Sequence, residues 1–355
     1  MKNKIIFTTI LIFIIFSLKA NSDNKIVSLK QSEKNVLPNQ NILVLKKWFD
    51  AWELVSKKIY KINKNQTPVE FVFFDDIYVY STSKITIPNG LSFNGPNFFN
   101  KKLNWKKEIH NGKIVLPNKQ EIPIEIICFA GTLNEIGSKS FFVMPLYDFW
   151  QNAGVESKEI SLEKLTTGVF LHEFSHTQQM RNFGKRISEI EAKYKFDFNF
   201  SDNIIQDYFK NETNYVSDFE NEVKLFYESA FSIDFTNSKK LAKQGFEKYN
   251  MRQDLFFKDK YKHFKEIDDL FLTMEGFGQY TMYVWLIDEN GGNIDKNLAI
   301  KAVRRDGKNW SQEQGFSLFL IFEKLSKSKR WVNDMVSKKV FSIKNLITNE
   351  LQQKN

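Results

Sequence analysis

The chain is organised around one five-residue stretch, His172-Glu173-Phe174-Ser175-His176. Only four histidines occur among the 355 residues, and two of them lie in this stretch. The surrounding pattern predicts a helix, and two residues four positions apart lie on the same face of a helix. Both imidazoles can therefore bind one Zn²⁺. The glutamate beside the first histidine, Glu173, is then placed to act as the general base toward a water at the metal.

The helix that carries this stretch is predicted to span residues 161–183. Ser161 is a candidate N-cap, and Glu163 lies in the first turn, where the helix dipole favours an acidic side chain. Leu165 and Val169 continue the stripe of the two histidines at helical spacing. This stripe is expected to face inward, where a buried imidazole needs a polar partner that a metal can supply. The alternative is a surface helix that carries two unrelated histidines.

Composition divides the chain into two parts. All seven prolines occur at or before Pro145, which is typical of a β-rich first part and a helical second part. We therefore predict an α+β fold, with an N-terminal α/β lobe containing a mixed sheet over residues 23–150 and a helical catalytic lobe over residues 151–355. Strand patterns occur at 69–80, 122–130 and 140–146, after a helical pattern at 42–62.

Helical patterns also fill the second part after the histidine helix. They cover residues 202–209, 217–232, 236–263, 266–287, 311–325 and 328–350. Ser311 with Gln314 predicts a capping box at the start of the fifth pattern. No stretch rich in Pro, Gly or Ser separates the two parts, so we expect one catalytic unit with two lobes.

The first residues have the pattern of an export signal. Lys2 and Lys4 precede an apolar run at 5–18, and small residues follow at 20–22. The apolar run is shorter than the roughly 20 residues that a membrane span needs. A signal peptide over residues 1–22 predicts an exported protein, periplasmic or secreted, without stable membrane insertion after cleavage. An uncleaved anchor is the alternative.

The charge pattern and the cysteine content argue against a nucleic-acid-binding protein and against a disulfide-stabilised one. The formal net charge falls from +9 to +6 without residues 1–22, because that segment holds three lysines and no acidic residue. The remaining basic residues are scattered, and no nucleic-acid-binding motif accompanies them, so a nucleic-acid partner is not expected. Cys128 is the only cysteine, so the chain forms no internal disulfide.

A catalytic zinc usually takes three protein ligands and leaves one position for water. No histidine follows closely after His176, which makes a downstream carboxylate the better candidate. Glu275 lies in Met274-Glu275-Gly276-Phe277-Gly278-Gln279-Tyr280, where two glycines within a helix indicate a close approach to another helix. Glu222 is the alternative third ligand, because its helical face also points inward.

These two segments together resemble the gluzincin metallopeptidases. The Glu275-Gly276-Phe277-Gly278 stretch is similar to the Glu-Gly-Phe-Ala stretch that supplies the zinc glutamate in the aminopeptidase N family. The resemblance implies a zincin-like fold and Zn²⁺ bound by His172, His176 and Glu275, with Glu173 activating water. The chain would then be an exported zinc-dependent metallopeptidase that hydrolyses a peptide or protein substrate. Similar folds place an edge strand before the histidine helix to hold the peptide, and residues 140–146 are the candidate.

The chain departs from the aminopeptidases in two respects. Glu275 follows His176 after 99 positions, a much longer interval than in that family. The Gly-Ala-Met-Glu-Asn segment that binds a substrate amino terminus is absent, so aminopeptidase specificity is not expected. The helical insert at 185–270 is expected to form a lid or a second lobe that closes over the cleft.

The sequence does not rank the groups that would stabilise a tetrahedral oxyanion. Tyr280, Tyr283 and His263 are the candidate donors. Arg304-Arg305 offers a binding site for a substrate carboxylate, but a solvated loop is the favoured interpretation.

Two other classes of function fit the same motif. One is a catalytically inactive binding or scaffold protein with a zincin fold, although the presence of Glu173 argues against a dead site. The other is a zinc hydrolase that acts on a non-peptide amide or ester.

Overall fold

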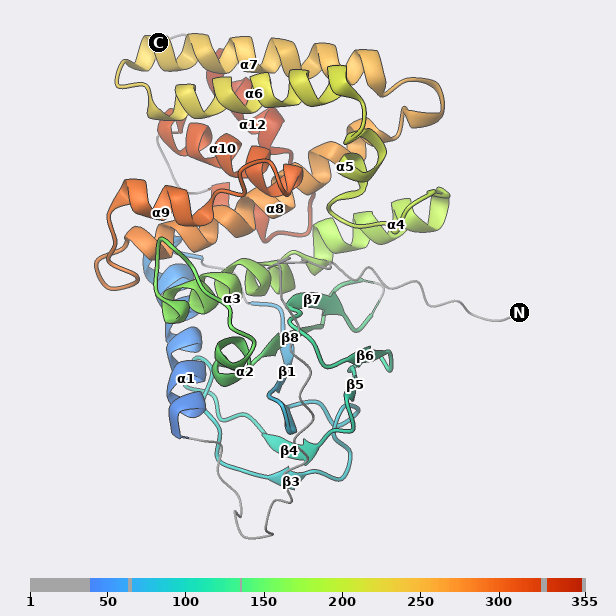
Figure 1. Ribbon diagram of the computed structural model, residues 1–355, viewed down its shortest axis with the longest axis vertical. Coiled ribbons are helices and arrows are strands. Elements are labelled where there is room, and N and C mark those ends of the chain that lie inside the picture. Colours follow the sequence, from blue (N-terminus) through green and yellow to red (C-terminus); the bar gives the residue numbers. More distant parts are fainter. Residues whose placement is uncertain (1–38, 63–65, 135, 327–330, 353–355) are drawn as a thin grey trace.

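The computed structural model describes residues 39–62, 66–134, 136–326 and 331–352 (Figure 1). A β-sheet with flanking helices forms one end of the molecule, and a stack of helices forms the other. The mixed α+β class predicted from the sequence is confirmed, with the sheet in the N-terminal part. The signal peptide predicted over residues 1–22 lies outside the described residues. Among the helices that the structure describes, none combines the length and apolarity needed to cross a membrane.

Six strands form the main sheet: β1 (Val69–Phe74), β2 (Tyr78–Ser81), β3 (Leu91–Ser92), β4 (Lys106–Ile109), β7 (Phe129–Thr132) and β8 (Ser140–Pro145). Their order is β3-β4-β2-β1-β8-β7. β1 and β8 are parallel, whereas the other neighbours are antiparallel. All residues of β8 are buried, as expected for a strand in the interior of a covered sheet. β5 (Lys113–Val115) and β6 (Glu121–Pro123) pair with each other separately.

The region predicted as one strand at 69–80 forms two strands with a turn between them. Asp75 accepts hydrogen bonds from the backbone amides of Ile77 at 2.8 Å and Tyr78 at 2.7 Å. An aspartate-centred turn of this kind reverses the chain, so β2 returns antiparallel to β1. The strand predicted at 140–146 is confirmed as β8. Of the strand predicted at 122–130, only the ends are extended, within β6 and β7.

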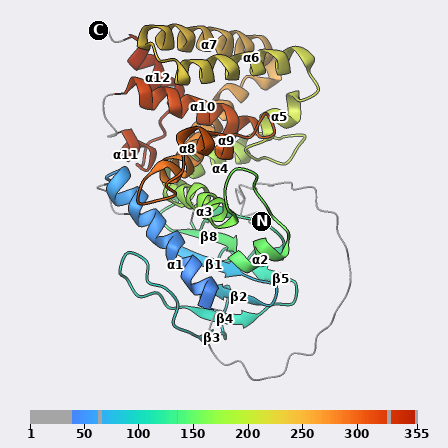
Figure 2. The same ribbon diagram turned by 60° about the vertical axis from the view of Figure 1, so that its left-hand side comes forward.

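The helices are α1 (Asn39–Glu53), α2 (Tyr147–Asn152), α3 (Leu162–Gln178), α4 (Lys185–Lys193), α5 (Ile204–Phe209), α6 (Thr213–Phe231), α7 (Phe235–Phe256), α8 (Phe264–Ile287), α9 (Lys296–Val303), α10 (Trp310–Leu325), α11 (Val332–Met335) and α12 (Ile343–Gln352). Two π-helical turns extend α1 and α3, namely η1 (Leu54–Ile59) and η2 (Met180–Gly184). α8 is central to the helical half, because it packs against α3 and against α10. The α6–α7 hairpin covers α10 (Figures 1 and 2).

Two details of the predicted helical half are wrong. The segment 328–350 is not one helix, since α11 ends at Met335 and α12 begins only at Ile343. The capping box predicted at Ser311 and Gln314 does not form. α10 already begins at Trp310, and the side chain of Gln314 donates to Glu222 instead.

The two long helices within residues 185–270 lie away from the histidine helix. α6 packs on α10 and α7 packs on α6, at the end of the molecule farthest from the sheet (Figure 1). Phe219 of α6 stacks on Trp310 of α10 with 4.7 Å between ring centroids, which directs the apolar face of the hairpin to α10.

One face of α3 is anchored to the sheet by aromatic side chains. Phe174 stacks on Phe71 of β1 with 5.8 Å between ring centroids, and Phe170 stacks on Trp48 of α1 at 5.7 Å. Each of these buried side chains contributes roughly 1.5–3 kcal/mol to the free energy of unfolding. The other face of α3, with both histidines, is thereby directed toward α8.

The partly buried carboxyl group of Asp269 lies between α8 and the start of α12, and we expect it to make the stability of the fold depend on pH. Ser342 Oγ donates to Asp269 Oδ1 at 2.7 Å. Burial raises the pKa of Asp269 from 3.8 to about 6, even though Ser342 and Lys344 favour its charged form. Since the folded protein then favours the protonated carboxyl, this group stabilises the fold below about pH 4, and that contribution is lost as the pH rises through about 6.

We expect Asp269→Asn to keep the hydrogen bond from Ser342 and to remove this pH dependence. The variant should be more stable than the wild type by about 1–2 kcal/mol at neutral pH and should lose that advantage near pH 4. Urea unfolding at both pH values measures the difference. Equal differences at the two pH values would contradict the assignment.

Candidate metal centre

The histidine helix begins where the sequence predicts. Ser161 Oγ accepts a hydrogen bond from the backbone amide of Lys164 at 3.3 Å, as an N-cap does. The chain is α-helical to Gln178 and continues through η2 to Gly184, close to the predicted end at 183.

Both histidines of α3 face one glutamate of α8. The Nε2 atoms of His172 and His176 lie 3.1 Å apart. The carboxylate of Glu275 spans them, with Oε2 at 3.1 Å from His172 Nε2 and Oε1 at 3.5 Å from His176 Nε2. Glu173 lies beside this group, with Oε1 at 3.9 Å from His172 Nε2. The structure therefore brings together the four residues that the sequence analysis places at the metal.

The separations in this group suit a tetrahedral zinc site. Zinc bonds of about 2.0–2.1 Å at tetrahedral angles place neighbouring ligand atoms about 3.3–3.4 Å apart. The two Nε2 atoms lie 3.1 Å apart, and each lies 3.1 or 3.5 Å from a different oxygen of Glu275, which is close to this spacing. Among the described residues, Glu275 Oε1 and Glu173 Oε2 have no hydrogen-bond partner. Buried oxygen atoms without partners are uncommon, and a metal ion with a water would satisfy both, so these residues fit zinc.

A glutamine side chain contacts the Nδ1 atom of each imidazole, on the side of the ring away from the Nε2 atoms. His176 Nδ1 lies 3.0 Å from Gln179 Oε1, and His172 Nδ1 lies 3.3 Å from the side-chain amide of Gln279. A metal bound through Nε2 leaves the ring proton on Nδ1, so each glutamine must then accept through Oε1. Gln312 Nε2 also donates to Glu275 Oε2 at 3.4 Å. All three proposed ligand side chains are thus held by amide groups.

The two glycines of α8 each allow a different helix to approach α8 closely. A Cβ atom at Gly278 would lie 2.7 Å from the imidazole of His172, so only glycine leaves room for that ring. A Cβ atom at Gly276 would lie 2.6 Å from the backbone of Gly315 on α10. The close approach that the sequence predicts is confirmed, and it involves a helix on each side of α8.

Burial and mutual contacts shift the pKa values of His172 and Glu275. Desolvation lowers the pKa of His172 to about 4, although Glu275 opposes this, so the imidazole is neutral at neutral pH. Desolvation acts to raise the pKa of Glu275, but the contacts with His176 and His172 outweigh it and lower the pKa below its usual value. Neutral imidazoles and an ionised carboxylate are the forms that bind a metal.

Glu173 has the environment of a proton acceptor. Burial raises its pKa well above the usual value, the negative charges of Glu275 and Asp202 raise it further, and Arg305 opposes them. A carboxylate with a raised pKa binds a proton more readily, which suits a general base.

Glu222, the alternative third ligand, has another partner. Its two carboxylate oxygens accept from Arg252 Nε at 2.8 Å and Arg252 Nη2 at 2.9 Å. Gln314 Nε2 donates to the same carboxylate at 3.0 Å. The inward direction expected for Glu222 is correct, but it leads to a buried ion pair between α6 and α7.

The structure does not place the three candidate oxyanion donors beside the histidines. Tyr280 packs among aromatic rings, 5.8 Å from Phe319, and Tyr283 packs 5.5 Å from Phe316. His263 stacks on Tyr194 at 4.2 Å, at the first turn of α8. Twelve positions of helix separate His263 from Glu275, which is roughly 18 Å along the axis.

Arg305 supplies the positive charge of this centre instead. Its Nε donates to Gln312 Oε1 at 2.7 Å, and its Nη2 lies 3.4 Å from Gln279 Oε1. Arg305 does lie in a loop, between α9 and α10, but its guanidinium is bound by side chains of the centre and not by solvent alone. Its neighbour Arg304 pairs with Glu313 at 2.7 Å and lies over the ring of Tyr227 at 4.2 Å. Arg305 follows the end of α9, and no periodic pattern in the sequence marks it.

The expected edge strand is also different. β8 lies between β1 and β7, so it has no free edge, and β7 forms this side of the sheet. β7 packs near α3, as β8 does. The prediction failed because β7 is short and because the apolar run that contains its first residues begins several positions before the strand.

Comparison with known proteins adds no relative. No protein-family model matches the chain, and neither does any curated protein or any solved structure.

Proposed function

We propose that the chain is an exported zinc-dependent metallopeptidase with a zincin-like fold. The convergence of Glu275 with His172 and His176 carries this proposal, because 99 positions of sequence separate the glutamate from the second histidine. Two nitrogen donors and one carboxylate are the ligand set of a catalytic zinc with one open position. The unpartnered oxygen of Glu173 beside this set favours an enzyme over an inactive scaffold.

Zinc at this position would acidify a water and polarise a carbonyl group. Glu173 takes the proton of the attacking water on its unpartnered Oε2 and returns it to the leaving amine. Arg305, held by Gln312, is the candidate to stabilise the negative charge on the carbonyl oxygen. A peptide would add to the sheet along β7, since that strand forms the edge nearest α3.

The metal content of purified variants tests the ligand set. We expect one zinc per chain in the wild type, loss of zinc in His176→Ala and Glu275→Gln, and retention in Glu222→Gln, whose carboxylate pairs with Arg252. Elemental analysis of folded protein gives the result. A folded wild type without zinc would contradict the proposed function, and cleavage of a peptide library separates a peptidase from a hydrolase of non-peptide amides.

We expect Arg305→Ala to keep the zinc and to lower kcat about 100-fold with a smaller change in KM, because the charge acts mainly in the transition state. Arg305→Lys should recover part of the activity, since it keeps a positive charge. Arg186→Ala is the matched control, because Arg186 pairs with Glu266 and Glu189 on the surface. An unchanged kcat in Arg305→Ala with full zinc content would exclude this role.

A further inference from the structure

A cavity with polar side chains in its lining lies between α5, α6, α8 and α10. It is a small cavity of about 10 Å³, just large enough for one occupant the size of a water molecule. Its polar lining includes Asp202 from the turn before α5, Asp268 from α8, and Ser311 and Gln314 from α10. Ser311 and Gln314 are three positions apart and share one face of α10. None of these residues belongs to the proposed zinc ligands.

Three of the residues that line this cavity carry buried oxygen atoms without a described partner. Asp202 is only 2% exposed, and neither of its carboxylate oxygens has a hydrogen-bond partner among the described residues. Ser311 Oγ and Gln314 Oε1 are also buried without a described partner. If this carboxyl is ionised, its burial is costly unless a positive charge lies beside it.

The surrounding side chains do not supply that charge. Burial raises the pKa of Asp202 well above its usual value, and Glu275 and Asp207 raise it further, while nearby backbone amides act in the opposite direction. Arg252, a buried guanidinium beside the lining residue Asp268, already forms two hydrogen bonds with Glu222. Its remaining carboxylate neighbour is Asp268, at 3.8 Å.

We propose that this cavity binds one hard cation, an alkali or alkaline-earth ion, through Asp202, Ser311 and Gln314. The four unpartnered atoms are all oxygen, the ligand type that Na⁺, Mg²⁺ and Ca²⁺ prefer, whereas zinc favours nitrogen and sulfur. The small volume admits a bare ion more readily than a hydrated one. The site is separate from the proposed zinc centre and does not depend on that function.

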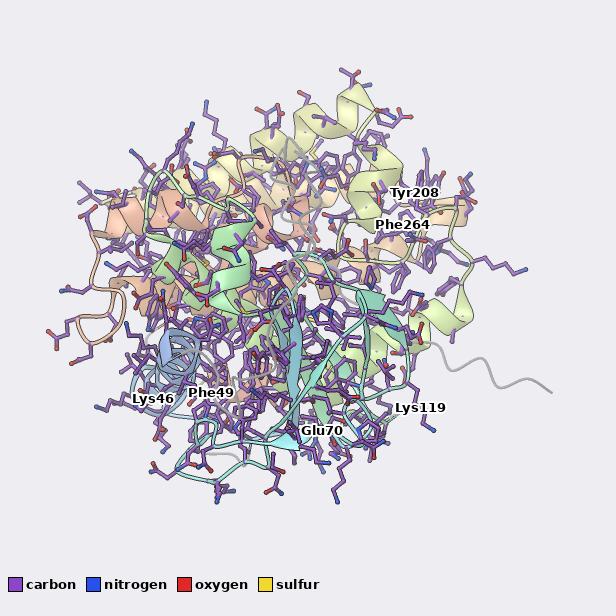
Figure 3. The ribbon with its side chains drawn as sticks, turned by 60° about the horizontal axis from the view of Figure 1, so that its bottom comes forward. Lys46, Phe49, Glu70, Lys119, Tyr208 and Phe264 are labelled. Carbon is purple, nitrogen blue, oxygen red and sulfur yellow. The ribbon has the colours of Figure 1, made fainter. Side chains whose placement is uncertain are left out.

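The bound ion would fasten the segment before α5 to α10. Gln206 already joins these parts, because its side chain accepts from the backbone amide of Trp310 at 3.2 Å and donates to the carbonyl of Lys308 at 3.0 Å. At the other side of the segment, Tyr208 of α5 lies next to Phe264 of α8, with 4.9 Å between ring centroids (Figure 3). The cation would therefore add a tie within an ordered contact rather than create a new one.

Thermal unfolding of the full-length wild type in NaCl, KCl, MgCl₂ and CaCl₂ tests the proposal, with choline chloride at equal ionic strength as reference. We expect at least one cation to raise Tm in a concentration-dependent manner. Asp202→Asn should abolish the response, and it should unfold no lower than the wild type in choline chloride because the uncompensated charge is gone. Ser311→Ala keeps that charge and should weaken the apparent affinity about tenfold.

Asp207→Asn is the control, since it removes a nearby acid that pairs with Lys210 rather than lining the cavity. It should keep the cation response. His176→Ala should keep it too, which separates this site from the zinc centre. If the wild type and Asp202→Asn respond equally to all four salts, the cavity holds only water and the proposal is wrong.

Discussion

Glu173→Gln is expected to keep one zinc per chain and to lose peptide hydrolysis by at least about 100-fold, and up to about 10,000-fold. The amide has the same shape as the carboxylate but cannot accept the proton of the attacking water. Glu173 approaches His172 Nε2 only at 3.9 Å, farther than Glu275, so its replacement should leave the ligand set intact. Steady-state cleavage of a peptide found by library screening measures the loss.

The matched control for this variant lies on the same helix. Glu163→Gln makes the same chemical change in the first turn of α3, where Glu163 pairs with Lys47 at the surface. It should leave both zinc content and turnover unchanged. Hydrolysis at the wild-type rate by Glu173→Gln would exclude Glu173 as the general base. Loss of zinc from that variant would instead make Glu173 part of the ligand set.

Glu222→Leu is expected to lower the free energy of unfolding by about 3–5 kcal/mol, because it leaves the buried guanidinium of Arg252 without its carboxylate. Both side chains of this pair are fully buried. Asp268 at 3.8 Å from Arg252 Nη2 replaces the lost charge only in part. Urea unfolding followed by far-UV circular dichroism measures the change, and the zinc content of the folded fraction should stay at the wild-type value.

The double variant Glu222→Leu/Arg252→Met separates a lost ion pair from lost packing. Since two apolar side chains of similar size replace both charges, it should recover most of the stability lost in the single variant. Lys46→Ala is the surface control, because Lys46 and Asp50 form an exposed pair that contributes about 0.5 kcal/mol or less. A loss as small as this in Glu222→Leu would show that solvent or another group already satisfies Arg252.

The parts of the site that lie on helices could be predicted from the sequence. The spacing of His172 and His176 indicates a shared helical face, and the glycines around Glu275 indicate a close helix contact. Gln279 follows Glu275 by one helical turn, so its place behind His172 was open to the same argument. Asp202 was missed and Arg305 was given a lesser role, because both lie in irregular chain, where no periodicity relates a side chain to its neighbours.

In the sheet, too, some features could be predicted from the sequence and others could not. Apolar runs identify β1 and β8, because central strands are buried on both faces and carry few polar residues. The order of strands depends on contacts between distant segments, which the local pattern does not contain. β7 therefore takes the edge position that the sequence analysis had given to β8.

Because His176 and Glu275 are far apart in the sequence, a metal that binds both would restrict the unfolded chain. A metal held by both His176 and Glu275 cross-links positions that are 99 residues apart, in a chain whose single cysteine excludes an internal disulfide. Closing a loop of about 100 residues reduces the conformational entropy of the unfolded chain by an amount equivalent to about 4–5 kcal/mol. The proposed metal would thus act on the unfolded chain as a disulfide does, so the same ion would supply both catalysis and stability.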